Sequence, residues 1–243
     1  MNVQDRRRLL GPGNAKPITF EPIVKEKDKQ EATEHDIKET LFLRSGLIEN
    51  CNGSSLVEFK SQHRQTSLIA SVYGPRAVRG SFTSKAAISV QIKNGSSGDY
   101  DKSRLKELAS FLTTVFSSVI NRSRYPKSGI DIFIHLTYDR DLQDEKNAGI
   151  AAIIPHCITG ITLALIDAGI EVLDITSGGH HNGSVFAFIK EGEEVTGFWK
   201  DPSRCDDNME ESLKVCKERY LNYKSIMTGY LFQNQKSESV QEA

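Results

Sequence analysis

The sequence predicts an α+β domain in which mixed sheets are covered by helices. Short runs rich in Val and Ile, separated by turn residues, occur before residue 95 and again around residues 170–200. Two segments between these groups, and one after them, instead carry apolar residues at helical spacing. Grouped strands with interleaved helices are typical of sheets that bury one face against covering helices.

The composition fits a folded protein without a dominant charge. A chain of 243 residues with 38% hydrophobic residues can build a sizeable core. The formal net charge of -1 arises from 31 basic and 32 acidic residues, so a polyanion would have to bind a local basic patch.

The compartment can be inferred from the cysteines and from the apolar runs. The four cysteines show no Cys-x-x-Cys spacing, which argues against a structural zinc site and a disulfide framework. No secretory signal follows "MNVQDRRRLLGP", and we expect no membrane span because Pro155 and His156 interrupt the most apolar segment, 149–165. A reducing compartment, the nucleus or the cytoplasm, is therefore expected.

Three regions are predicted along the chain. Residues 1–40 form an N-terminal arm and charged linker, since 25–40 are charged at most positions. Residues 41–232 form the folded domain. The polar tail 233–243, "QNQKSESVQEA", is expected to be disordered.

The first half of the domain combines a strand meander with a helix. Strands are predicted in "LRSGLIEN", "GSSLVEFK", "TSLIASVYGPR" and "AAISVQIK". Apolar residues between Leu105 and Val119 follow helical spacing, which predicts a helix from about Asp101 to Asn121. The segment "GIDIFIHLTY" then alternates as a strand.

The second half is predicted to begin with a buried helix. The segment from about Pro155 to Ala168 is apolar on nearly all sides, and Gly169 is a suitable C-terminal stop. Strands follow in "IEVLDIT", "GSVFAFIK" and "EEVTGFWK", the last two as a hairpin. A long helix from about Met209 to Phe232 completes the domain.

Two aspartates and a His pair are candidates for chemistry. Asp167 and Asp174 could bind a divalent metal or transfer protons, but we expect them to stabilise turns or form ion pairs. Asp167 ends a helix, where an anion needs a backbone or cationic partner. His180 and His181 are expected in a solvated turn, since no third metal ligand stands at a recognisable spacing. We predict no metal site.

The buried helix carries two further candidates. We expect His156 to be a hydrogen-bonded core residue, because no matched nucleophile is evident in the sequence. Cys157 is expected to act as a small core hydrophobe.

Two basic clusters lie in predicted connections. Arg76 and Arg79 occur in "GPRAVRG", and Arg122 and Arg124 occur in "NRSRYPKSG", together with Tyr125. Such clusters suit a phosphate backbone or the acidic groups of a neighbouring subunit. A solvated surface with scattered ion pairs is the alternative.

Three segments resemble the RNase PH family, whose fold is also described as ribosomal protein S5 domain 2-like. They are "GSSLVEFKSQHRQTSLIASVYGPRAVRG", "SRYPKSGIDIFIHL" and "ITLALIDAGIEVLDIT", in the family's order and at similar separations. The resemblance implies an RNase PH-like fold and, in active members, phosphorolytic trimming of RNA from its 3′ end. Those members bind phosphate through a Gly-Thr/Ser-Arg turn that opens the central helix.

The residues at the matching positions lack the family's chemistry. The phosphate turn corresponds to Ala152, Ile153 and Ile154, and the key Asp of a later strand corresponds to Ala187 or Phe188. Of the acidic residues that follow, only Glu193 and Glu194 remain. The resemblance therefore implies no catalytic residues, no cofactor and no enzymatic activity.

The segments "RRRLLGP", "GLIENCNGS", "YPKSGIDIF" and "IPHCITGITLAL" further resemble a ring subunit of the fungal RNA exosome. This implies other RNase PH-like subunits in a six-membered ring, an S1/KH-domain cap protein and single-stranded RNA as partners, in the nucleus, nucleolus and cytoplasm. Arg76, Arg79, Arg122 and Arg124 are then candidate RNA-binding residues.

Two other functions stay open. The first is an active phosphorolytic exoribonuclease completed by a partner subunit, which would need an Arg and a Thr or Ser near the start of the helix that contains His156. Arg140, upstream in the sequence, is one source of that Arg. The second is an interaction module without a role in RNA binding.

Overall fold

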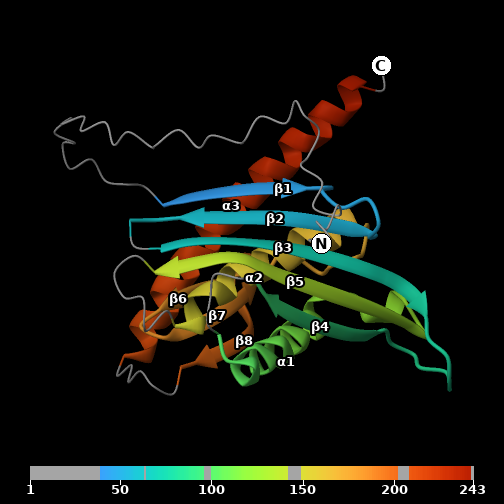
Figure 1. The fold of residues 1–243 in the computed structure, drawn as a ribbon, viewed down its shortest axis with the longest axis horizontal. Coiled ribbons are helices and arrows are strands. Elements are labelled where there is room, and N and C mark those ends of the chain that lie inside the picture. Colours follow the sequence, from blue (N-terminus) through green and yellow to red (C-terminus); the bar gives the residue numbers. More distant parts are fainter. Residues whose placement is uncertain (1–38, 63, 96–99, 142–148, 202–207, 242–243) are drawn as a thin grey trace, which may run out of the picture. The chain divides into compact units, whose positions relative to one another are not determined.

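Two sheets and three α-helices make up the described part of the chain in this computed structural model (Figure 1). The described residues are 39–62, 64–95, 100–141, 149–201 and 208–241. They lie in one compact unit, residues 37–243. The predicted α+β class is confirmed. Residues 1–38, most of the predicted arm and linker, lie outside the described residues.

The large sheet has the strand order β1-β2-β3-β5-β4. Its neighbours are antiparallel except β4 and β5, which are parallel and are connected through helix α1, Lys102–Val119. The Asp101 side chain caps α1 by accepting a hydrogen bond from the Ser103 N–H (3.3 Å). The strands are β1 (Thr40–Ser45), β2 (Gly53–Lys60), β3 (Arg64–Ala77), β4 (Ala87–Asn94) and β5 (Ser128–Asp141).

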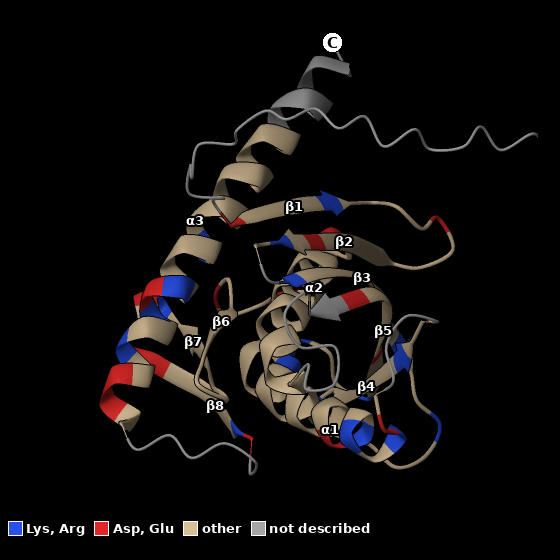
Figure 2. Cartoon of the chain, turned by 60° about the vertical axis from the view of Figure 1, so that its left-hand side comes forward, with Lys and Arg blue, Asp and Glu red and all other residues tan. Residues whose placement is uncertain are grey.

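The small sheet has the order β6-β7-β8 and is antiparallel. Figure 2 shows it between helices α2 and α3. Its strands are β6 (Ser177–His181), β7 (Ser184–Ile189) and β8 (Glu194–Lys200), the helices are α2 (Ile154–Asp167) and α3 (Met209–Gln241), and short 3-10 helices are η1 (Arg122–Arg124), η2 (Ile150–Ile153) and η3 (Lys190–Gly192).

Helix α2 packs against both sheets. At Gly160 a Cβ atom would lie 2.8 Å from Leu68 Cδ1 of β3, and Ile158 Cδ1 would lie 3.4 Å from a Cβ at Gly178 of β6. Together with η2 the helix gives an 18-residue segment, Ile150–Asp167, with mean hydropathy 1.8, of which 83% is buried. By length and composition this segment could cross a membrane, contrary to the sequence expectation, but here it fills the core.

The first strand of the small sheet, β6, is formed by other residues than the sequence pattern predicts. The segment "IEVLDIT" contributes only an isolated bridge, between Ile120 and Val172, whereas "SGGHH" forms β6. Strand propensity disfavours glycine, so the pattern pointed to the Val- and Ile-rich run. The glycines are needed because a Cβ at Gly179 would lie 2.4 Å from Cys216 Cα of α3.

Two further predictions, those for the His pair and for the C-terminal tail, are wrong. His180 and His181 end β6, and the turn consists of Asn182 and Gly183, both at positive φ. Helix α3 continues to Gln241, so the tail is helical over 233–241. The tail contains no Gly or Pro, and its Gln, Lys and Glu residues favour continuation of the helix.

Substitution of Gly179 should test the approach of α3 to β6. We expect Gly179→Ala to lower the free energy of unfolding by about 1–3 kcal/mol or more, because backbone atoms of Cys216 occupy the space of the new methyl group. The matched control, Gly229→Ala, lies within α3 with nothing within 4 Å of the added Cβ. It should raise the stability by about 0.5–1 kcal/mol. Equal effects of the two substitutions in urea denaturation would contradict this packing.

Candidate functional site

The start of α2 is packed with apolar side chains. Ile153 and Ile154 are fully buried and Ala152 is half-buried, at the junction of η2 and α2. These are the positions that the family resemblance assigns to the phosphate-binding turn. None of the three side chains can donate a hydrogen bond, so they offer nothing to an incoming anion.

His156, in the first turn of α2, is held by aromatic contacts. Its ring stacks on Phe59 of β2 with the centroids 4.3 Å apart and lies 5.8 Å from the ring of Tyr223 of α3. Burial, and to a smaller extent the nearby positive charges of Arg64, His180 and Arg219, together lower its pKa to about 3. Its Nδ1 has no hydrogen-bond partner among the described residues, so the expected hydrogen-bonded role is wrong for this atom. The imidazole is neutral near pH 7.

A buried ion-pair network lies near His156 and Cys157 and was missed by the sequence reasoning. Arg64 of β3 donates two hydrogen bonds to Asp139 of β5, Nε to Oδ1 at 3.0 Å and Nη2 to Oδ2 at 2.6 Å. Thr66 donates to Asp139 Oδ1 (2.6 Å), and the Tyr100 hydroxyl donates to Oδ2. The guanidinium is thus engaged by a fully buried carboxylate.

This network bears on the catalytic alternative. An Arg and a Thr do lie in the neighbourhood of the start of α2, as that alternative requires, but they are Arg64 and Thr66 and both bind Asp139. The side chain of Arg140 lies outside the described ones. The sequence did contain an indication of this network. Arg64 and Thr66 are two residues apart in β3, so their side chains point to the same face of the sheet, and that face is buried.

The second family position is also apolar. Ala187 and Phe188 lie in β7 and are 0% and 1% exposed. Phe188 packs against Tyr220 of α3, with ring centroids 5.5 Å apart. Glu194, which follows, is paired with Lys190 at 2.5 Å. Neither Ala187 nor Phe188 can hold a cation or a proton.

The two aspartates have the structural roles expected of them. Asp167 Oδ2 accepts a hydrogen bond from the Ser54 N–H (2.8 Å), and Asp174 is paired with Lys224 (2.9 Å). Asp174 lies at a bend and not in a strand. Partial burial alone would raise its pKa, but hydrogen bonds from Lys224, Lys190 and Ile175 lower it overall.

Two other predictions concern metal binding and Cys157. Cys157 is a buried core residue as expected, and burial raises the pKa of its thiol to about 12. Across the residues that the structure describes, no group of three or more His, Cys, Asp or Glu is placed to hold a metal ion.

The two basic clusters, distant in sequence, form one surface. Backbone hydrogen bonds join the loop after β3 to the segment around η1: Val78 N–H to Lys127 O (3.1 Å), Lys127 N–H to Thr83 O (2.8 Å) and Ala86 N–H to Arg122 O (3.1 Å). We call residues 75–86 and 121–129 together the basic surface. Neither stretch contains an acidic residue.

Most of the predicted RNA-binding arginines on the basic surface already have partners. Arg76 pairs with Asp131, Arg124 pairs with Glu171 (3.0 Å), and Arg122 Nε donates to the Ala86 carbonyl (2.8 Å). Arg79 is exposed and has no ion-pair partner within the described part of the chain. The same holds for Lys85, which the sequence reasoning missed, and for Lys127.

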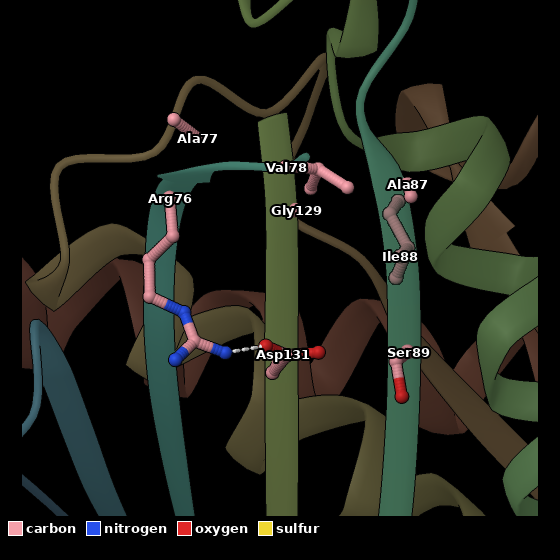
Figure 3. Close-up of a pocket in the computed structure, with 8 residues that line it drawn as sticks. All are labelled: Arg76, Ala77, Val78, Ala87, Ile88, Ser89, Gly129 and Asp131. Carbon is pink, nitrogen blue, oxygen red and sulfur yellow. Dashed lines mark hydrogen bonds and ion pairs between the residues drawn. The ribbon is translucent and has the colours of Figure 1, made fainter. Parts of the chain in front are cut away.

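A pocket overlaps the basic surface at the place where β3 ends and β4 and β5 begin. Its volume is about 400 Å³. In Figure 3 the side chain of Arg76 reaches from β3 toward Asp131 on β5, while Ser89 lies on the neighbouring β4 and Val78 lies over Gly129. The pocket therefore combines the Arg76–Asp131 ion pair and the Ser89 hydroxyl with a mostly apolar lining.

Comparisons with known proteins agree with this fold. Residues 39–171 match the RNase PH family, described as "3' exoribonuclease family, domain 1". The chain is 24% identical to the exosome complex component MTR3 of Chaetomium thermophilum over 255 residues, which is 95% of this chain and 86% of that protein. It is 27% identical to the human exosome complex component RRP41 over 168 residues, 63% of each protein.

A solved structure supports the fold independently. The crystal structure of rice (Oryza sativa) Rrp46 superposes with a TM-score of 0.59 at 16% identity, covering 83% of this chain and 97% of that chain. The predicted RNase PH-like fold is confirmed.

The buried neutral His156 should make stability depend on pH. The unfolded chain binds a proton on this residue below about pH 6.5, whereas the folded chain does so only near pH 3. The free energy of unfolding should therefore fall as the pH falls from about 6.5 toward 3, by up to about 1.4 kcal/mol per pH unit. In urea denaturation between pH 6 and 4.5, His156→Phe should reduce the slope of the free energy of unfolding against pH by about 1.4 kcal/mol per pH unit, which corresponds to one proton. An unchanged slope in His156→Phe would refute the assignment.

Proposed function

We propose, from the premise that this chain belongs to the 3′ exoribonuclease (RNase PH) family, that it is a non-catalytic ring subunit of an RNA exosome. In this function the chain supports 3′-to-5′ processing and degradation of rRNA, snRNA and mRNA without cutting RNA itself. The similarity to MTR3 along 95% of the chain supports ring membership.

One observation carries the non-catalytic part of the proposal: both positions at which the family places its reactive groups are apolar and buried. Ile154 replaces a phosphate-binding Arg, and Ala187 or Phe188 replaces a carboxylate, with all three residues buried. Removal of one preorganised electrostatic group typically costs about 3–4 kcal/mol of transition-state stabilisation. Loss of two such groups makes phosphate attack on RNA too slow to matter.

The partners follow from the same resemblance. We propose that the chain pairs with other RNase PH-like subunits in a hexameric ring, contacts an S1/KH-domain cap protein and acts in the nucleus, nucleolus and cytoplasm. The basic surface would then face single-stranded RNA, because a cationic surface attracts the phosphate backbone without reading the base sequence.

The alternative is a phosphorolytic exoribonuclease whose site a partner completes. The proximity of Arg64 to the start of α2 and the similarity to RRP41 favour it. Against it stands the commitment of Arg64 to Asp139, since breaking a buried pair leaves an uncompensated charge at a cost of about 3–5 kcal/mol.

An assay of phosphorolysis should separate the two functions. The purified chain, and a reconstituted ring that lacks hydrolytic nucleases, should release no nucleoside diphosphate from 3′-labelled RNA in the presence of inorganic phosphate. An active RNase PH enzyme run in parallel controls for the substrate. Release by the purified chain, or release by the ring that is traced to residues of this chain, would show the proposal to be wrong.

A further inference from the structure

Phe82 is the most exposed of the large apolar side chains among the described residues, at 72%. It lies on the loop between β3 and β4, inside the basic surface. An aromatic ring this open to water contributes little to the core and is free to contact a ligand. Single exposed apolar side chains are common, so the surroundings of Phe82 decide whether it binds one.

The loop that carries Phe82 is fixed in place. The Thr83 carbonyl, next to Phe82, accepts a hydrogen bond from the Lys127 N–H (2.8 Å), and the Val78 N–H donates to the Lys127 carbonyl (3.1 Å). Arg122 adds a side-chain bond to the Ala86 carbonyl (2.8 Å). An aromatic side chain on such an anchored loop is presented at a defined place, so little of its binding energy is lost to ordering the backbone.

The charges on the basic surface identify the kind of ligand. Arg79 and Lys85 flank Phe82 in sequence, Lys127 is bonded to the same loop, and none of the three has an acidic partner within the described residues. A protein-binding patch would favour further apolar side chains and a centre poor in lysine, whereas Val78 is the only other large exposed apolar residue described on this loop. Cations around an isolated aromatic ring suit single-stranded nucleic acid.

We propose that Phe82 is a base-stacking side chain for single-stranded RNA, with Arg79, Lys85 and Lys127 contacting the phosphates on either side. This inference rests on the proposed function for the choice of RNA. It also reassigns the RNA contacts, since Arg122 holds the loop, and Arg76 and Arg124 are engaged by carboxylates. Stacking accepts any base, so the contact binds RNA without sequence preference.

The test measures RNA binding by the reconstituted ring that contains the full chain. Fluorescence anisotropy with labelled oligo(U) and oligo(A) is recorded at several salt concentrations. Phe82→Ala should weaken binding about tenfold and leave the salt dependence unchanged, and Phe82→Trp should restore binding. The combined change Arg79→Ala, Lys85→Ala and Lys127→Ala should reduce the slope of log K against log salt by about 0.7 for each phosphate that the variant no longer neutralises.

Phe232→Ala is the matched control, because Phe232 is 63% exposed but lies on α3; it should leave RNA binding unchanged. A photoreactive phenylalanine at position 82 should crosslink to RNA, and one at position 232 should not. Unchanged affinity of the Phe82→Ala ring, or loss of ring assembly in place of RNA affinity, would overturn the inference. Failure of the wild-type chain to enter any ring would instead overturn the proposed function, and size-exclusion chromatography detects that separately.

Discussion

The burial of α2 between two sheets is the constraint on which the rest of the fold depends. A helix can approach two sheets at once only where side chains are missing, and glycines on both sides supply those places: Gly53 and Gly160 toward the large sheet and Gly178 toward the small one. A Cβ at Gly53 would lie 2.3 Å from the backbone nitrogen of Ala168. Because α2 is enclosed in this way, its first turn belongs to the core.

The enclosure limits what the start of α2 could bind. An anion at the start of α2 would have to displace Ile153 and Ile154, which are fully buried, and would meet a neutral His156 in place of a cation. Arg64 and Asp139, which lie near this point, are paired with each other. Nε and Nη2 of Arg64 are engaged by Asp139, so an anion would have to displace that carboxylate to reach them. Cations that an anion can reach without displacing core residues lie on the basic surface.

The sequence predicted the elements whose pattern is local. Helical spacing located α1, and the apolar composition with Pro155 in the first turn located α2. It failed for β6, where the need for Gly178 and Gly179 comes from helices that pack on both faces and overrides strand propensity. The partners of Arg76 and Arg124 could not be predicted either, because Asp131 and Glu171 lie far from them in sequence and approach them only in the folded chain. The apolar residues at the two positions that the family resemblance assigns to reactive groups, by contrast, were visible from residue identity alone.

The basic surface contains cations of three kinds, and the difference decides how it responds to a polyanion. Arg122 is half-buried and holds the loop, so its removal would disturb the surface itself. Arg76 and Arg124 form exposed ion pairs, which are worth about 0–1 kcal/mol, so a phosphate can replace their carboxylate partners at small cost. Arg79, Lys85 and Lys127 have no ion-pair partner among the residues that the structure describes. A polyanion therefore meets these three cations first and recruits the paired ones afterwards, which gives affinity that grows with the length of backbone bound and falls steeply with salt.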